Sequence, residues 1–117
     1  MSATASPWLV RLTAAAETDF QDILRWTLAQ FGQAQTQLYA ETIADALKDL
    51  SAGPGVAGVT ERNDIAKGIC TLHVARKERK GRHFIIFRIG KSAGLKAIDV
   101  LRLLHDAMDL QRHLPPS

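Results

Sequence analysis

The sequence predicts an α+β domain with the order β-α-α-β-β-β, in which an antiparallel helix hairpin packs on an antiparallel β-sheet. Two apolar patterns with helical spacing follow each other and are separated by about one residue. Three β-rich segments joined by turn residues then follow a loop rich in glycine and proline. The chain has 117 residues, of which 46% are hydrophobic and 23% charged, and this balance suits a single globular domain over residues 1–117.

The first half of the chain is predicted to form one strand and two helices. The short apolar segment 8–12 indicates a strand. Thr13 is a suitable N-cap for a helix that starts at Ala14, and Gly32 is a suitable residue to end it. A second helical pattern runs from about residue 33 to residue 50. Because so short a connection forces two helices back on each other, we expect an antiparallel hairpin.

The second half is predicted to form the sheet. Residues 51–58 (SAGPGVAG) must form a loop, and residues 59–68 show no clear pattern. Consecutive strands joined by short turns favour an antiparallel meander, and the helix hairpin is expected to cover one of its faces. We expect strands at 69–75, 82–89 and 97–104, turns at 76–82 and 91–94, and a short C-terminal tail.

Two of these strands carry apolar side chains on both faces. Strict alternation in the last strand places Ile98, Val100 and Leu104 on one face, and Ala97, Leu101 and Leu103 on the other. An antiparallel sheet covered on one side normally has a polar second face, so either the chain's own tail and loops or another chain must cover it. We favour another chain. The residues expected to contact it are Phe84, Ile86, Ile98, Val100, Leu101 and Leu103.

Charge is divided unevenly along the chain. Residues 1–52 hold three basic and six acidic side chains, whereas residues 53–117 hold twelve basic and six acidic ones. Such a division arises by chance or marks a face that meets an acidic partner. The densest basic run would bind nucleic acid or an acidic peptide, or form a solvated turn, and few aromatic residues interleave it. The run consists of Arg76, Lys77, Arg79, Lys80 and Arg82.

The residues that often carry chemistry give no strong signal. His105, Asp109 and His113 follow each other at intervals of four, which suits a metal or acid–base site on a helix but also an exposed polar face. No glycine-rich phosphate loop, nucleophile elbow or HExxH motif occurs, and the one cysteine cannot form an internal disulfide. We expect no metal ion and no cofactor. The chain has no apolar run of about 18 residues and no signal peptide, so we expect a cytoplasmic protein.

The combination of segments resembles the ParE branch of the RelE/ParE toxins of bacterial type II toxin–antitoxin modules. LTAAAETDFQDILRWTLAQFG is similar to the first strand and helix of that family, and GICTLHVARKERKGRHFIIFRIG to its central hairpin. IDVLRLLHDAMDLQRHLP is similar to its terminal strand and tail. The resemblance covers about residues 8–114 and implies the small RelE/ParE-like α+β fold.

The resemblance implies a toxin that inhibits DNA gyrase by binding, blocks replication and is neutralised by a ParD-like antitoxin, with which it forms a hetero-oligomer. RelE members are instead ribosome-dependent mRNA endonucleases, and the fold alone does not choose between them. RNA cleavage needs a base, an acid and a cation for the phosphate. Tyr39 lies in the apolar stripe of the second helix, whereas Arg82 and Arg88 would supply cations and His105 or His113 the acid. We favour gyrase inhibition without a catalytic residue.

The tail after the last strand is the segment expected to contact the target. Met108 offers a flexible apolar contact, Arg112 offers hydrogen-bond donors, and Asp109 either positions Arg112 or is solvated. Leu110 and Leu114 are expected to pack the tail against the domain. We expect no membrane partner and no sequence-specific nucleic-acid binding. The residues predicted to bind the target are His105, Met108, Asp109, Arg112 and His113.

Overall fold

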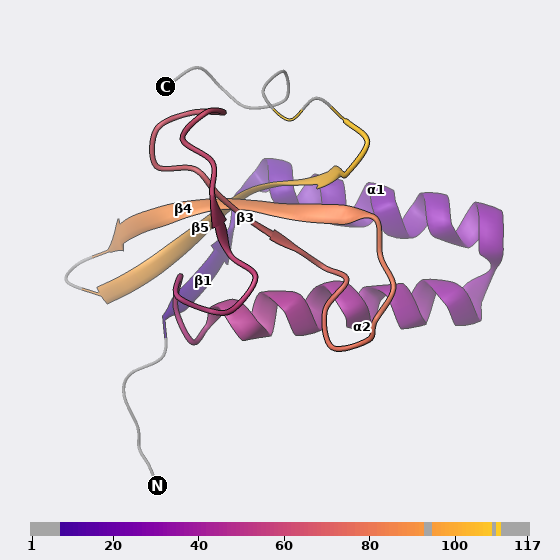
Figure 1. The fold of residues 1–117 in the computed structure, drawn as a ribbon. Helices are drawn as coiled ribbons and strands as arrows, with labels where there is room; N and C mark the ends of the chain where they lie inside the picture. The colour runs from indigo at the N-terminus through magenta and orange to yellow at the C-terminus, as the bar shows by residue number, and fades with distance from the viewer. Residues whose placement is uncertain (1–7, 93–94, 109, 111–117) are drawn as a thin grey trace, which may run out of the picture.

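The computed structural model of the protein describes residues 8–92, 95–108 and 110, and the side chains of residues 91, 92 and 95 are outside this description. A helix hairpin lies against a mixed five-stranded sheet (Figure 1). The elements in chain order are β1 (Leu9–Leu12), α1 (Ala14–Phe31), α2 (Gln33–Leu50), β2 (Thr60–Glu61), β3 (Cys70–His73), β4 (His83–Ser92) and β5 (Leu95–His105).

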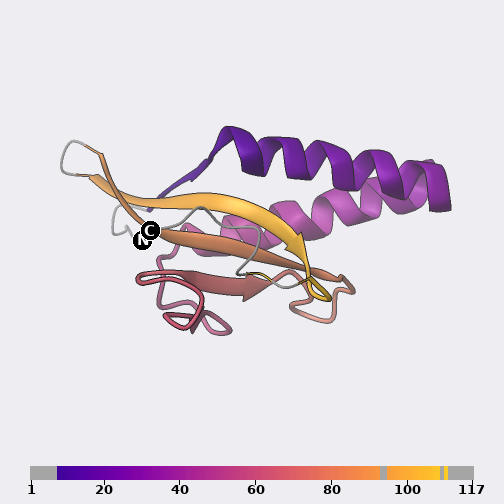
Figure 2. The ribbon, with the colours of Figure 1, turned by 90° about the horizontal axis from the view of Figure 1, so that it is seen from above.

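The helix hairpin has the bounds and caps that the sequence predicts. The Thr13 hydroxyl accepts a hydrogen bond from the backbone N–H of Ala16 at 3.1 Å, which is the expected N-cap of α1. Gly32 is the one residue between the helices, and its φ of 88° is a conformation that favours glycine. In both ribbon views the turn between the helices lies beyond the ends of the strands, so this tip projects from the domain (Figures 1 and 2).

The sheet has the order β1-β5-β4-β3-β2, and it is mixed because β1 pairs with β5 in parallel. The predicted meander is confirmed for β3, β4 and β5, which pair antiparallel. The two-residue strand β2 lies in the segment without a clear pattern and was not predicted. The predicted turn at residues 91–94 is too long, since β4 and β5 continue to Ser92 and Leu95 and these two residues pair with each other.

A first core fills the space between the helix hairpin and one face of the sheet. Six of its aliphatic members are completely buried, and their burial stabilises the packing of the hairpin on the sheet. Its buried members are Ala16, Ile43, Ala46, Leu50, Leu72, Val74, Ile85, Phe87, Ile98, Val100 and Leu103.

A second core lies on the other face of the sheet. The segment between β2 and β3 and the start of the tail lie on the side of the sheet away from α2 and pack on this face (Figure 1). The chain itself therefore supplies the cover that we attributed to another chain. The buried members are Ile65, Ile69, Ile86, Leu104 and Leu110, and Phe84 and Leu101 are partly buried against them. The expectation of an exposed apolar surface on the strands is therefore wrong for the four buried residues, Ile86, Ile98, Val100 and Leu103.

A β-bulge explains why strict alternation fails in β5. The ladder pairs Ile86 with Arg102 but Phe87 with Val100, so Leu101 is an extra residue on β5. Beyond this residue the phase of the strand changes, and Leu103 joins Val100 in the first core. Leu104, which we expected beside Val100, lies in the second core.

Among the described residues, no helix is both long enough and apolar enough to span a membrane.

Candidate functional site

The basic run folds back onto the acidic helix α2. Arg76 Nε lies 3.1 Å and Lys77 Nζ 2.9 Å from the Asp49 carboxylate. Arg79 Nη2 lies 2.7 Å from Asp45 Oδ2. Part of the charge division along the chain is therefore neutralised within the chain, and the interpretation of the run as a solvated turn is wrong for Arg76, whose side chain is only 17% exposed.

Asp49 is the centre of this contact between α2 and the turn. Burial acts to raise the pKa of its carboxyl, but hydrogen bonds from Lys77 and Arg76 outweigh burial and bring the pKa below its ordinary value. Arg76 also donates a hydrogen bond to the backbone carbonyl of Ala57. The run thus has two parts: Arg76 holds the fold together, whereas Lys80 makes no ion pair with any residue that the structure describes.

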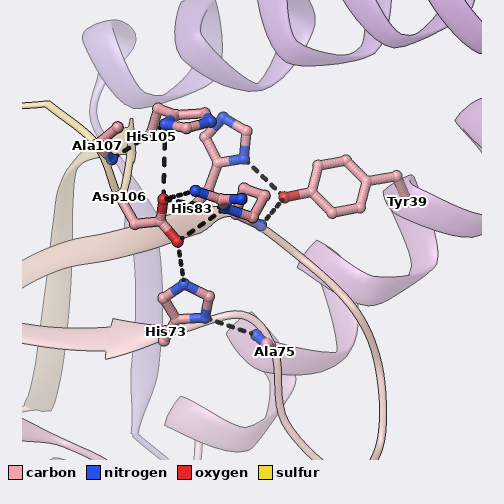
Figure 3. Close-up of polar contacts among 8 residues, drawn as sticks. Tyr39, His73, Ala75, His83, His105, Asp106 and Ala107 are labelled. Carbon is pink, nitrogen blue, oxygen red and sulfur yellow. Dashed lines mark hydrogen bonds and ion pairs between the residues drawn. The ribbon is translucent and has the colours of Figure 1, made fainter.

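A polar cluster joins α2, the basic turn and the ends of β3 and β5 (Figure 3). The Tyr39 hydroxyl lies 2.6 Å from His83 Nδ1 and accepts a hydrogen bond from the backbone N–H of Arg82 at 3.0 Å. His73 Nε2 lies 3.0 Å from Asp106 Oδ2, and the Arg82 guanidinium lies 3.1 Å from Asp106 Oδ1. The cluster therefore links residues that are far apart in the sequence.

The hydrogen bonds to backbone groups assign the histidine tautomers. Nδ1 of His105 accepts from the Ala107 N–H at 3.0 Å, and Nδ1 of His73 accepts from the Ala75 N–H at 3.0 Å. We assign the Tyr39 hydroxyl proton to Nδ1 of His83, because the hydroxyl accepts from the Arg82 N–H and no other acceptor for its proton lies among the described residues. In its neutral form, each of the three rings then carries its proton on Nε2. The Nε2–H of His73 donates to the Asp106 carboxylate. Nε2 of His83 and Nε2 of His105 have no hydrogen-bond partner among the described residues.

Burial keeps His83 neutral near pH 7. It lowers the pKa of the ring from 6.5 to about 4, and the neighbouring His105 ring, 5.3 Å away between centroids, acts in the same direction. Burial likewise raises the pKa of Tyr39, although the hydrogen bond from Arg82 opposes it. Gly81 permits this packing, because a side chain there would collide with Val74 and touch the Tyr39 ring. With Nδ1 occupied by the Tyr39 hydroxyl, the neutral His83 ring offers a hydrogen-bond donor, its Nε2–H.

A pocket of about 550 Å³ lies between this cluster and the tip of the helix hairpin. Trp26 and Phe31 of α1 form one side of it, and both are exposed, by 59% and 63%. The basic turn forms the other side with Arg79, Lys80 and Arg82, and the floor includes Tyr39, His83 and His105.

The predicted target-binding tail is described only at its start. His105 is the last residue of β5 and lines the pocket, Met108 is 45% exposed, and Leu110 is buried in the second core as expected. Asp109, Arg112, His113 and Leu114 lie outside the described residues, as does the proposed grouping of His105 with Asp109 and His113. Within the described part of the chain, no three His, Cys, Asp or Glu side chains are placed to hold a metal ion.

Sequence reasoning missed the aromatic side of the pocket and the role of His83. Trp26 stands outside the apolar stripe of α1, and an aromatic residue off the buried stripe is the signal that would have marked it. Tyr39 and His83 lie 44 residues apart, and no local pattern indicates that they meet.

Comparison with known proteins agrees with this fold. The sequence profile of the family described as "ParE toxin of type II toxin-antitoxin system, parDE" matches residues 10–110. Toxin ParE of Escherichia coli is 33% identical over 103 residues, which cover 88% of this chain and 89% of that protein. Toxin ParE1 of Mycobacterium tuberculosis is 28% identical over 103 residues, with 88% and 94% covered.

A solved structure, entitled "Chromosomal ParDE TA system from P. aeruginosa", superposes with a TM-score of 0.67 at 18% sequence identity. The match covers 86% of this chain and 98% of that one, and it extends over the hairpin and the sheet. With a sequence profile that spans both halves of the fold, the chain belongs to the ParE toxin family of type II toxin–antitoxin systems.

Proposed function

We propose that this ParE-type toxin acts in the cytoplasm by binding DNA gyrase and blocking replication, without catalysis of its own, and that a ParD-like antitoxin neutralises it. The tautomers of the polar cluster support this proposal. In His83 and His105 the basic lone pair on Nδ1 is occupied by a hydrogen bond, so neither ring is free to act as a general base toward the pocket. With a pKa of about 4, His83 is also rarely protonated at neutral pH and so makes a weak proton donor.

The second candidate is a RelE-like, ribosome-dependent mRNA endonuclease. One observation favours it: Tyr39, Arg82, His83 and His105 meet in a single pocket, although they come from different elements. Such a nuclease would need one of the imidazoles to exchange its hydrogen bond to the backbone or to Tyr39 before it takes up a proton. We therefore rank it second.

We propose that gyrase contacts the tail and that the antitoxin covers the exposed apolar side chains of the helix hairpin. Met108 is exposed in the tail, and Leu28, Phe31 and Leu38 are exposed at the hairpin tip, by between 52% and 63%. Covering such side chains stabilises a complex by about 25 cal/mol per Å² of apolar surface before ordering costs. Phe84 and Leu101, which remain partly exposed, are the members of the predicted apolar set that an antitoxin would still reach.

A crossed pair of substitutions tests both surfaces. Met108→Asp is expected to weaken gyrase inhibition while antitoxin binding persists, and Leu38→Asp is expected to do the reverse, because each replaces an exposed apolar contact by a charge. Deleting the tail from His105 is a poorer test, since it removes Asp106 and also Leu110 from the second core. If each variant lost gyrase inhibition and antitoxin binding to the same extent, the assignment of two separate surfaces would be contradicted.

A test in cells distinguishes the two candidate functions by whether DNA synthesis or protein synthesis stops first. After induction of the toxin, incorporation of labelled thymidine is expected to stop before that of labelled methionine, because replication fails first. Co-expression of the cognate antitoxin is expected to restore both. Arrest of methionine incorporation first, with mRNA cleavage, would favour the nuclease.

A further inference from the structure

The pocket at the hairpin tip combines aromatic faces with cations, although the two are separated in the sequence. Trp26 and Phe31 lie edge to face, with ring centroids 5.7 Å apart, and they expose most of their surface. Facing them are Arg79, Lys80 and Arg82, from a run that contains no aromatic residue. The fold thus supplies to the basic run the aromatic partners that the sequence lacks locally.

The polar side of the pocket offers single, convergent hydrogen-bond donors. The Nε2–H groups of His83 and His105 have no acceptor among the described residues, and both rings line the pocket. Lys80 adds an ammonium group without an ion pair in the described chain. Three cations face this pocket, whereas two carboxylates, Asp45 and Asp106, neutralise Arg79 and Arg82 in part. The net positive charge of these groups favours an anionic ligand.

We propose that this pocket binds one nucleotide unit, with the base against Trp26 and Phe31 and the phosphate on the donors of His83, His105 and Lys80. The volume of about 550 Å³ is in the range of small-ligand sites. Stacking on aromatic rings accepts any base, and cations that contact phosphate read no sequence, so the binding is without sequence preference. The nucleotide is either free or part of a single strand.

An acidic peptide is the competing occupant, and the donor pattern argues against it. Arginine recognises a carboxylate through two parallel hydrogen bonds, but Arg79 and Arg82 already contact Asp45 and Asp106. The donors that remain are separate N–H groups, which suit the several oxygens of a phosphate. Flat aromatic faces at 59% and 63% exposure also match a base better than a carboxylate side chain.

Quenching of Trp26 fluorescence measures the binding directly. The chain has two tryptophans, so Trp8→Phe leaves Trp26 as the single reporter. This protein is titrated to millimolar concentration with AMP, with (dA)6 and with (rA)6, and separately with adenosine, inorganic phosphate and a hexaglutamate peptide. We expect quenching by AMP or by the oligonucleotides, with adenosine and phosphate at least tenfold weaker because each makes half of the contacts. Quenching by AMP identifies a free nucleotide, and quenching by an oligonucleotide alone identifies a single strand.

Matched substitutions link the signal to the pocket. In the Trp8→Phe background, Phe31→Ala and Lys80→Ala are each expected to weaken binding about five- to tenfold, in line with the loss of a stacking face or of a phosphate contact. Ile89→Ala and Lys67→Ala remove an exposed apolar and an exposed basic side chain outside this pocket and are expected to leave binding unchanged.

The inference is overturned if no nucleotide quenches Trp26, if only the hexaglutamate peptide does, or if the two control variants weaken binding as much as the pocket variants. Gyrase inhibition is measured on the same proteins. A toxin that inhibits gyrase but binds no nucleotide overturns this inference alone and leaves the proposed function standing.

Discussion

Asp19 joins the helix hairpin to the sheet, and its substitution is predicted to lower the free energy of unfolding. Its Oδ2 accepts hydrogen bonds from Arg102 Nε at 2.7 Å and from the Leu103 backbone N–H at 2.9 Å. Its Oδ1 accepts from Arg102 Nη2 at 2.9 Å. One carboxylate therefore satisfies three donors of β5, and its side chain is only 12% exposed.

Asp19→Asn keeps the shape of the side chain but removes its charge and turns one acceptor into a donor. Hydrogen bonds to charged groups contribute about 1.5–3 kcal/mol each, and breaking a fully buried ion pair costs about 3–5 kcal/mol. Because Arg102 retains some access to water, with 28% of its side chain exposed, the expected loss of unfolding free energy lies below the upper value. We predict a loss of about 2–3 kcal/mol.

Asp22→Asn is the matched control on the same helix. Asp22 pairs with Arg25 at 3.0 Å, but these side chains are 61% and 75% exposed, so the pair is expected to contribute less than about 0.5 kcal/mol. Urea unfolding followed by circular dichroism measures both variants. The Asp19 variant is expected to lower the midpoint by about 1–1.5 M, for a slope of about 2 kcal/mol per M. Equal midpoints for the two variants would refute the role assigned to Asp19.

Three further predictions concern the turn, the polar cluster and the second core. Arg76→Ala is expected to cost about 1–3 kcal/mol of unfolding free energy, because it leaves Asp49 partly unpaired. Lys77→Ala is expected to cost less than about 0.5 kcal/mol, because the Lys77 side chain is 67% exposed. Similar urea midpoints for the two variants would argue against a structural role of Arg76. Folding lowers the pKa of the His83 ring from 6.5 to about 4, so the unfolded chain binds more protons than the folded chain between these pH values. The free energy of unfolding is therefore expected to fall by about 1–2 kcal/mol as the pH drops from 6.5 to 4. The His83→Gln variant is expected to lack this pH dependence. Ile65→Ala is expected to cost about 2 kcal/mol, and a loss near zero would show that the second core contributes little.

The helix hairpin was predictable from the sequence because its signals are local. Thr13 caps α1 and Gly32 separates the two helices, and each acts on residues within one turn of itself. The strands β3, β4 and β5 were predictable for the same reason, because each β-rich segment is bounded by turn residues that lie next to it in the sequence. The resemblance to the ParE family is also confirmed, since the stretches that carry it extend over nearly the whole fold.

The covering of the second face was not predictable in this way. Ile65 and Ile69 lie in a segment without periodicity, so nothing local shows that they pack on Ile86 and Leu104. The bulge at Leu101 depends on how β5 pairs with β4, and it shifts the phase of the strand without a mark in the sequence.

The pocket depends on tertiary structure in the same manner. Its aromatic side comes from α1, its floor from α2, β4 and β5, and its basic side from the turn before β4. The sequence indicated the basic run and weighed His105 and Tyr39 separately as chemical groups. Only the fold brings them together with Trp26, Phe31 and His83.

The most direct measurement of the central claim is a DNA cleavage assay with gyrase. The purified toxin is incubated with gyrase, ATP and supercoiled plasmid, the reaction is stopped with detergent and protease, and the DNA is resolved on a gel. A parallel reaction contains translating ribosomes and a labelled mRNA. We predict that linear DNA accumulates with toxin concentration, that added ParD-like antitoxin prevents this, and that the mRNA stays intact. Cleavage of the mRNA on the ribosome, with no change in the DNA, would contradict the account.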